Sequence, residues 1–299
     1  MLIGKSAGDN MKKKIDKTSQ FISKAELNEL YTNQKLSDQQ IGEIFGMSYG
    51  RIHRLRSKYN IKAIEYYERH HKQVLNQKEK EFLVGTLLGD GHLRWRNKID
   101  KRAYPQLMLE QTTSHFEYMV WLKDQMKEWL FDQDKQLKQS RKLLKRTGKV
   151  YHSYAIQTIC HPVFIEFFNG FYMNGKKNIN IDFIDKYFTE FSFAVWLMDD
   201  GTISKNRNIA ICSHSFSKDE NQKLKELLQK KFSLSPNIWA SGSKSYLGFS
   251  KKDSEKITEL LKDLVIPSMQ YKLISSETTK EANDSLIDES FEGIVQLQK

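Results

Sequence analysis

The sequence predicts an α+β protein built from an internal duplication and preceded by a small all-helical domain. An apolar stretch that ends in Asp-Gly occurs twice, as LVGTLLGDG at 83–91 and as FAVWLMDDG at 193–201. Each copy is followed by the same succession of helix-like and strand-like stretches, in the order αββαββα. Duplicated units of this size predict two similar halves related by pseudo-two-fold symmetry within one chain.

Each element of the two halves has its own signal. In the first half the stretches after the apolar helix are YPQLMLEQT, HFEYMVWLKDQMKEWL, KVYHSYAIQT and FIEFFNGFY. In the second half they are NIAICSHS, DENQKLKELLQKKF, PNIWASGSKSYLGFS and KITELLKDLV. Ile209 and Ile211 alternate with smaller or more polar residues, as expected for a strand in an antiparallel sheet with one wet face.

The segment before the duplication has a helical pattern with a tight turn. Ser37 and Gln40 have the spacing of a capping box, and the Gly46-Met47-Ser48 turn separates that helix from the next one. The second helix carries basic residues beside its apolar face: Arg51, Arg54 and Arg56. This pattern predicts a helix-turn-helix whose second helix could enter a major groove, although a charged packing module has the same pattern.

The sequence predicts that the chain is divided into five regions. They are a helix-turn-helix module at 1–60, a linker at 61–80, a first repeat at 81–178, a second repeat at 179–276 and a C-terminal tail at 277–299.

The overall composition narrows the function classes. The 299 residues carry a formal net charge of +11, which favours a polyanionic partner, with nucleic acid ahead of an anionic membrane surface. The two cysteines, Cys160 and Cys212, form no pairing pattern, which indicates a reducing compartment and no zinc knuckle. No apolar run reaches the roughly 18 residues of a membrane span. The sequence therefore predicts a soluble intracellular protein that acts outside membranes.

The two Asp-Gly ends suggest a chemistry. Gly85 and Gly89 are four residues apart, so they lie on one helical face and permit close approach of a second helix. If the two apolar helices pack side by side, Asp90 and Asp200 meet at one rim, where their carboxylates repel. A divalent cation removes that repulsion, and a site of oxygen ligands suits magnesium. One Asp-Gly alone would commonly be a helix end followed by a turn; two at matched places favour a functional site.

These paired stretches resemble the signature of the LAGLIDADG homing endonucleases, in the single-chain form with two fused repeats. Further matches are NGKKNINIDFIDKYFTEFSFAVWLMDDG, SHSFSKDE and IPSMQYKLISSET, and together they span about two thirds of the chain. The resemblance implies a duplicated αββαββα LAGLIDADG fold with antiparallel DNA-binding sheets. It also implies a monomeric, site-specific endonuclease that cuts a long double-stranded DNA target with a divalent metal, Mg²⁺ or Mn²⁺, and leaves 3′ overhangs.

The resemblance also assigns residues. Asp90 and Asp200 correspond to the catalytic, metal-binding carboxylates, and the carbonyls of Gly89 and Asp199 to supporting metal ligands. Lys177 and Lys272 correspond to the family's active-site lysines, which stabilise phosphate charge or order the attacking water. Positioning of phosphate without a catalytic role is the alternative for both lysines.

Candidate DNA contacts follow the two acids. They are Arg94, Arg96, Lys205 and Arg207, with solvated loops as the alternative. His214 stands where close relatives carry Gln, and could bond water or phosphate or simply sit on the sheet.

Two other functions stay open on the same fold: a non-cleaving transcription regulator, and a maturase that binds intron RNA. The presence of both predicted catalytic aspartates and both predicted active-site lysines favours the endonuclease over these two functions. The helix-turn-helix favours a bacterial or phage host over an organelle.

Overall fold

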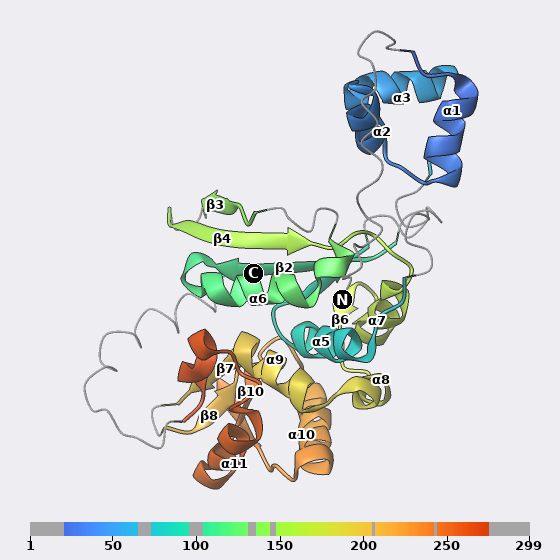
Figure 1. Ribbon diagram of the computed structural model, residues 1–299. Helices are drawn as coiled ribbons and strands as arrows, with labels where there is room; N and C mark the ends of the chain where they lie inside the picture. Colours follow the sequence, from blue (N-terminus) through green and yellow to red (C-terminus); the bar gives the residue numbers. More distant parts are fainter. Residues whose placement is uncertain are drawn as a thin grey trace, which may run out of the picture. The chain divides into compact units, whose positions relative to one another are not determined.

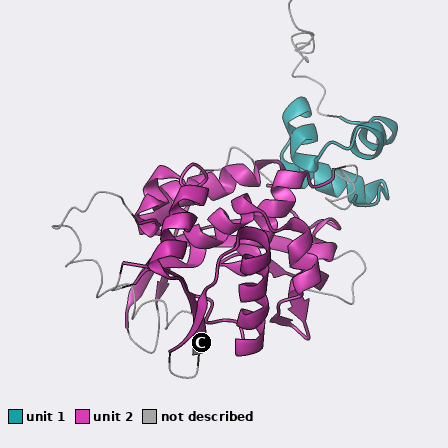
Figure 2. Cartoon of the chain, turned by 90° about the horizontal axis from the view of Figure 1, so that it is seen from below, with its two compact units in different colours: residues 1–73 teal, residues 74–299 magenta. Residues whose placement is uncertain are grey.

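The computed structural model describes residues 21–64, 73–95, 104–130, 136–143, 148–204, 207–241 and 244–274. The chain divides into two compact units, residues 1–73 and 74–299 (Figure 2). The predicted tail at 277–299 lies outside the described residues. The predicted linker at 61–80 overlaps the start of a helix at Gln77, and the repeat boundaries themselves stay predictions.

The described part of the first unit contains helices and connecting turns, and no strand. Helix α1 (Lys24–Asn28) continues into a π-helical turn at Glu29–Asn33, followed by α2 (Asp38–Phe45) and α3 (Tyr49–Lys58). The predicted capping box is present, since Ser37 Oγ accepts a hydrogen bond from the Gln40 N–H while the Gln40 side chain accepts one from the Ser37 N–H. Gly46 ends α2 in the left-handed conformation, with φ 63°, where glycine meets no Cβ penalty.

The second unit contains the predicted αββαββα order twice (Figure 1). The elements of the first repeat are α5 (Gln77–Leu88), β1 (His92–Arg94), β2 (Gln106–Thr112), α6 (Phe116–Gln125), β3 (Gln139–Leu143), β4 (Val150–Gln157) and α7 (Phe164–Phe171). Those of the second are α9 (Glu190–Asp200), β7 (Gly201–Ile203), β8 (Ile209–Ile211), α10 (Lys218–Phe232), β9 (Asn237–Ser241), β10 (Lys244–Gly248) and α11 (Lys251–Leu261).

A short segment joins the repeats. A two-stranded hairpin, β5 (Tyr172–Met173) and β6 (Lys176–Lys177), is followed by helix α8 (Ile181–Tyr187). After α11 a 3₁₀ helix runs over Pro267–Lys272.

The two sheets share one topology. Their strand orders are β1-β2-β4-β3 and β7-β8-β10-β9, and every pairing in both is antiparallel. In β2 the residues alternate, so that Leu107 and Leu109 are buried on the helix side while Glu110 is exposed. Equal topology in both halves confirms the predicted duplication.

Helices α5 and α9 pack against each other at the centre of this unit. All residues from Phe82 to Leu88 in α5, and from Ser192 to Met198 in α9, are buried. A helix that is apolar on every side belongs in a core, because no face is left for water.

The glycine at the middle of α5 sets the distance between these two helices. A Cβ atom at Gly85 would overlap the Ser192 carbonyl oxygen and lie 2.7 Å from Val195 Cβ. The missing side chain therefore lets the backbone of α9 approach α5, as the glycine spacing predicts.

Replacing Gly85 with Ala should lower the free energy of unfolding of this unit by about 1–3 kcal/mol, because overpacking outweighs the gain in helix propensity. Urea unfolding of the full chain measures it. Gly50→Ala in α3 is the control, since no atom lies within 4 Å of a Cβ at that position. A Gly85→Ala protein as stable as the unsubstituted one would contradict close packing at this point.

Candidate active site

The two Asp-Gly sequences meet where α5 and α9 end. A Cβ atom at Gly89 would lie 2.5 Å from Asp199 Cβ, so the first helix end touches the second. The Asp90 N–H donates a hydrogen bond to Asp199 Oδ2 at 3.3 Å. Asp90 is also close enough to raise the pKa of Asp200. The structure thus brings the predicted acids together at one rim.

The two predicted lysines make matching contacts in this site. Lys177 Nζ donates to the Gly89 carbonyl oxygen at 2.8 Å, and Lys272 Nζ donates to the Asp199 carbonyl oxygen at 2.9 Å. Lys272 also donates to the Met198 carbonyl oxygen. In each repeat, therefore, a lysine bonds to the carbonyl just before the predicted catalytic aspartate. The family resemblance assigns these same two carbonyls a supporting role at a metal.

Burial and mutual repulsion shape the protonation of the acids. Desolvation, and then the charge of Asp90, raise the pKa of Asp199 to about 7. The same two causes, with Asp199 as a third, raise the pKa of Asp200 well above its ordinary value. Desolvation lowers the pKa of Lys177 and of Lys272, while the neighbouring carboxylates oppose that shift.

The donor set suits a hard divalent cation completed by other oxygens. Asp90 and Asp200 offer carboxylates, and Gly89 and Asp199 offer carbonyl oxygens. In the part of the chain that the structure describes, no three or more His, Cys, Asp or Glu side chains are grouped to hold a metal by themselves. Magnesium commonly takes one or two protein carboxylates and fills its shell with water and phosphate, so these residues fit it.

Sequence reasoning missed three polar side chains in this site: Gln111, Tyr118 and Thr86. Gln111 Nε2 donates to Asp90 Oδ2 at 3.0 Å, and Tyr118 OH and Thr86 Oγ1 donate to Asp199 at 2.7 and 3.1 Å. A signal for Gln111 did exist. It follows Leu107 and Leu109 on the buried face of β2, and a buried polar residue needs a partner.

The residues of the second unit that are predicted to contact DNA have different surroundings. Arg94 is exposed on β1, and Arg207 is exposed in the β7–β8 connection with φ 60°. His214 lies against the ring of Tyr246, with centroids 5.2 Å apart. Arg96 and Lys205 lie outside the described residues.

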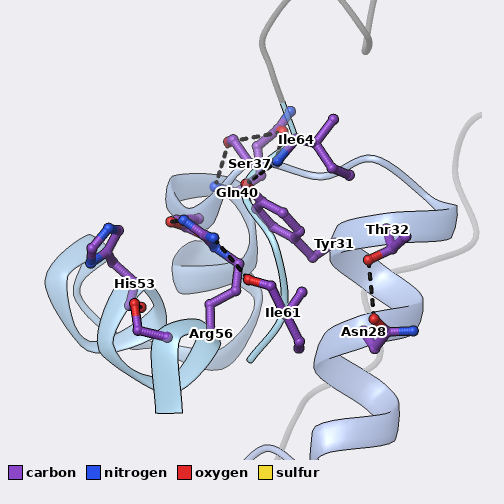
Figure 3. Close-up of polar contacts among 11 residues, drawn as sticks. Asn28, Tyr31, Thr32, Ser37, Gln40, His53, Arg56, Ile61 and Ile64 are labelled. Atoms are coloured by element: carbon purple, nitrogen blue, oxygen red, sulfur yellow. Dashed lines mark hydrogen bonds and ion pairs between the residues drawn. The ribbon is translucent and has the colours of Figure 1, made fainter. Parts of the chain in front are cut away.

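The first unit separates its three arginines by burial. Arg51 and Arg54 are exposed on α3, while Arg56 is 7% exposed. Arg56 donates two hydrogen bonds to the carboxylate of Asp38, at 2.9 and 3.0 Å. It donates a third to the Ile61 carbonyl oxygen at 3.3 Å (Figure 3). Its guanidinium carbon also lies 4.4 Å from the centre of the Tyr31 ring. This packing role replaces the DNA contact expected for Arg56, because its donors are already engaged in the interior.

Comparison with known proteins decides the family. The model of the LAGLIDADG DNA endonuclease family matches residues 80–257, more than half of the chain. The chain belongs to this family. The match covers most of α5, all of α9 and both four-stranded sheets.

Individual relatives agree with the family match. A probable intron-encoded endonuclease 1 from Wickerhamomyces canadensis is 28% identical over 222 residues, which cover 72% of this chain and 91% of the relative. A probable intron-encoded DNA endonuclease 3 from Mycosarcoma maydis is 34% identical over 126 residues, which cover 40% of this chain and 93% of the relative. A cytochrome b mRNA maturase bI2 from Debaryomyces hansenii is 26% identical over 201 residues, covering 67% of this chain and 74% of the relative.

A solved structure is similar in fold. The homing endonuclease I-WcaI bound to its DNA recognition sequence superposes with a TM-score of 0.63 and 25% sequence identity, over 74% of this chain and 98% of that one. The further resemblance of the sequence to one member of the family, I-SceI, stays a prediction, because the matches bear on the family as a whole.

No helix in the described part of the chain is long and apolar enough to cross a membrane. The intron-encoded relatives named above come from fungi, so the preference for a bacterial or phage host has no support from them.

The raised pKa of Asp199 predicts how stability depends on pH without metal. The folded state binds a proton at Asp199 up to about pH 7, whereas an unfolded Asp loses it near pH 4. The metal-free protein should therefore lose stability as pH rises through this window. Urea unfolding in EDTA at pH 5 and pH 8 measures the loss, and Asp199→Asn should reduce it. If the stability of the unsubstituted and Asp199→Asn proteins depended equally on pH, the raised pKa would not belong to Asp199.

Proposed function

We propose that this chain is a site-specific homing endonuclease that makes a double-strand break in a long DNA target and leaves 3′ overhangs. The observation that supports the proposal is the approach of Asp90 to Asp199 and Asp200 at the seam of the duplicated fold, with a lysine-bonded carbonyl just before Asp90 and before Asp200. The two repeats supply two such centres in one chain, so a monomer suffices to cut both strands. The DNA-bound relative of similar fold supports DNA as the substrate.

The residues of the site have separate tasks in this proposal. Asp90 and Asp200 hold a divalent cation, Mg²⁺ or Mn²⁺, with the carbonyls of Gly89 and Asp199 in support. The cation supplies charge stabilisation at the phosphate and lowers the pKa of a bound water. Lys177 and Lys272 stand beside the same carbonyls, where an ammonium can stabilise phosphate charge or order the attacking water.

Substrate binding in this proposal uses the exposed faces of the sheets. Arg94 and Arg207 are exposed and near the two acids in sequence, and Arg96 and Lys205 are proposed with them. His214 is proposed to reach water or phosphate from its place against Tyr246. Strands can enter the major groove, where all four base pairs are distinguishable.

The helical first unit is proposed to be a helix-turn-helix that adds DNA contacts. Its helices α2 and α3 are joined by the Gly46 turn, and α3 exposes Arg51 and Arg54. Such contacts would go mainly to phosphates and raise affinity in a salt-dependent way.

A second candidate function is splicing assistance as a maturase. The observation that favours it is the mRNA maturase relative, which matches over 67% of this chain. Splicing of an intron transcript containing this reading frame, with and without purified protein, tests it. Splicing that proceeds equally without the protein would exclude this role.

Changing Asp200→Asn should abolish double-strand cleavage and leave DNA binding intact or tighter, because the lost carboxylate repelled phosphate. The targets are found by cutting a randomised duplex library with Mg²⁺ and sequencing the ends. Gel-shift affinity and cleavage of the selected duplex then measure binding and activity separately.

Asp124→Asn serves as the matched control, since Asp124 is exposed in the last turn of α6, outside the site. Unchanged Mg²⁺-dependent cutting by the Asp200→Asn protein would show that the active site lies elsewhere.

Replacing Arg51 and Arg54 together with Ala should weaken DNA binding more than it slows cleavage of bound DNA. If each contacts one phosphate, the slope of log affinity against log salt should fall by about 2. The control removes two lysines of the same unit outside α3, Lys24 and Lys62. A slower single-turnover rate at saturating enzyme with unchanged affinity would contradict this division of tasks.

A further inference from the structure

The second repeat carries a carboxylate at the position where the first repeat has glycine. Asp199 precedes Asp200 as Gly89 precedes Asp90, and its side chain turns into the seam between the helices. Asp199 Oδ2 accepts hydrogen bonds from Thr86 Oγ1 at 3.1 Å and from the Asp90 N–H at 3.3 Å. Asp199 Oδ1 accepts one from Tyr118 OH at 2.7 Å. All three donors belong to the first repeat.

The groups that hold Asp199 are themselves held by packing. Tyr118 is fully buried, and its ring stacks on Trp121 with centroids 5.7 Å apart. Thr86 is 1% exposed inside α5. A carboxylate bonded to two buried hydroxyl groups has little freedom to move, so its hydrogen bond to the Asp90 N–H fixes the peptide of Asp90.

The side chain of Asp90 is held by a connected set of bonds. Gln111 Nε2 donates to Asp90 Oδ2 at 3.0 Å and lies 3.5 Å from Asp199 Oδ1. Gln111 Oε1 is 3.3 Å from His115 Nδ1, which can donate to it. Asp90 is therefore restrained at its N–H by Asp199 and at its carboxylate by Gln111.

The part of the chain that the structure describes provides no equivalent restraint at the second centre. Within the described residues no hydrogen bond is made to the carboxylate of Asp200. At the position that matches Asp199, Gly89 has no side chain to offer. The two centres differ in how firmly the protein holds them, although their lysine–carbonyl contacts match.

We propose that the Asp199 carboxylate is a positioning group, supplied by the second repeat, that sets the Asp90 centre of the first. It acts through the Asp90 peptide and never touches the scissile phosphate. This inference rests on the proposed function, because its consequence is unequal dependence of the two DNA strands on Asp199. A group that only packs the helices together would affect both strands alike.

The test compares strand-specific cleavage in single turnover, with the two strands of the duplex labelled differently. Asp90→Asn first identifies the strand that depends on the Asp90 centre. Tyr118→Phe, which keeps the buried ring and removes one bond to Asp199, should slow that strand about tenfold. Asp199→Asn should slow it on the order of 10- to 100-fold, as loss of an outer-shell partner typically does. The other strand should stay within about twofold, so nicked DNA accumulates.

A second measurement follows metal dependence on the same strand. The Mg²⁺ concentration that gives half of the maximal rate should rise several-fold in Tyr118→Phe for the affected strand and stay unchanged for the other. Tyr187→Phe is the matched control, because it removes a phenol–carboxylate bond of 3.0 Å to Glu166 away from the site. Thermal unfolding of each variant shows whether it folds normally.

The outcomes separate the two proposals. If the unsubstituted protein cuts DNA but the variants slow both strands equally, or slow neither, the positioning role of Asp199 is wrong. The nuclease assignment then stays intact. An unsubstituted protein that cuts neither strand of any library duplex overturns the nuclease assignment, and the inference with it.

Discussion

The close approach of α5 to α9 is the constraint on which the site depends. The missing side chain at Gly85 lets the Ser192 backbone come near, and Gly89 does the same for Asp199. The two helices therefore end side by side, with their carbonyl ends and carboxylates in one place. Helix C-termini carry partial negative charge, so this arrangement concentrates like charge in a desolvated seam.

The like charges in this seam repel one another, and the protein offsets the repulsion in two ways. Lys177 and Lys272 donate to the carbonyl oxygens, which opposes the charge of the helix ends. Hydroxyl and amide donors from the first repeat form hydrogen bonds that stabilise the carboxylates of Asp199 and Asp90. Burial, and then the neighbouring carboxylates, still raise the pKa of Asp199 and of Asp200. A bound divalent cation would offset the remaining repulsion, which links the packing of two helices to the proposed chemistry.

Local signals in the sequence predicted the fold well. The αββαββα order, the capping box at Ser37 and the turn at Gly46 all follow from periodicity and cap chemistry, which act over a few residues. Arg56 was misjudged for a physical reason. Its partner Asp38 lies 18 residues away, and no local pattern tells a buried arginine from its exposed neighbours on the same helix.

The candidate site was predictable only in its outline. The motifs and the family resemblance predict Asp90, Asp200 and both lysines, and the structure places these residues near one another. Their catalytic roles stay proposals. The side-chain role of Asp199 could not be found in this way, because the resemblance assigns only its carbonyl. That side chain has meaning only once α5 lies against α9, since its partners are 81 to 113 residues away in sequence.

The two lysines reach the same kind of carbonyl from different local structures. Lys177 follows a tight turn, in which Asn174 and Gly175 have φ values of 53° and 80°, and lies on strand β6. Lys272 ends a 3₁₀ helix that begins at Pro267. The repeats thus share αββαββα topology but diverge in the segments that follow it. Two different backbone structures thus place an ammonium against the carbonyl that precedes a predicted catalytic aspartate.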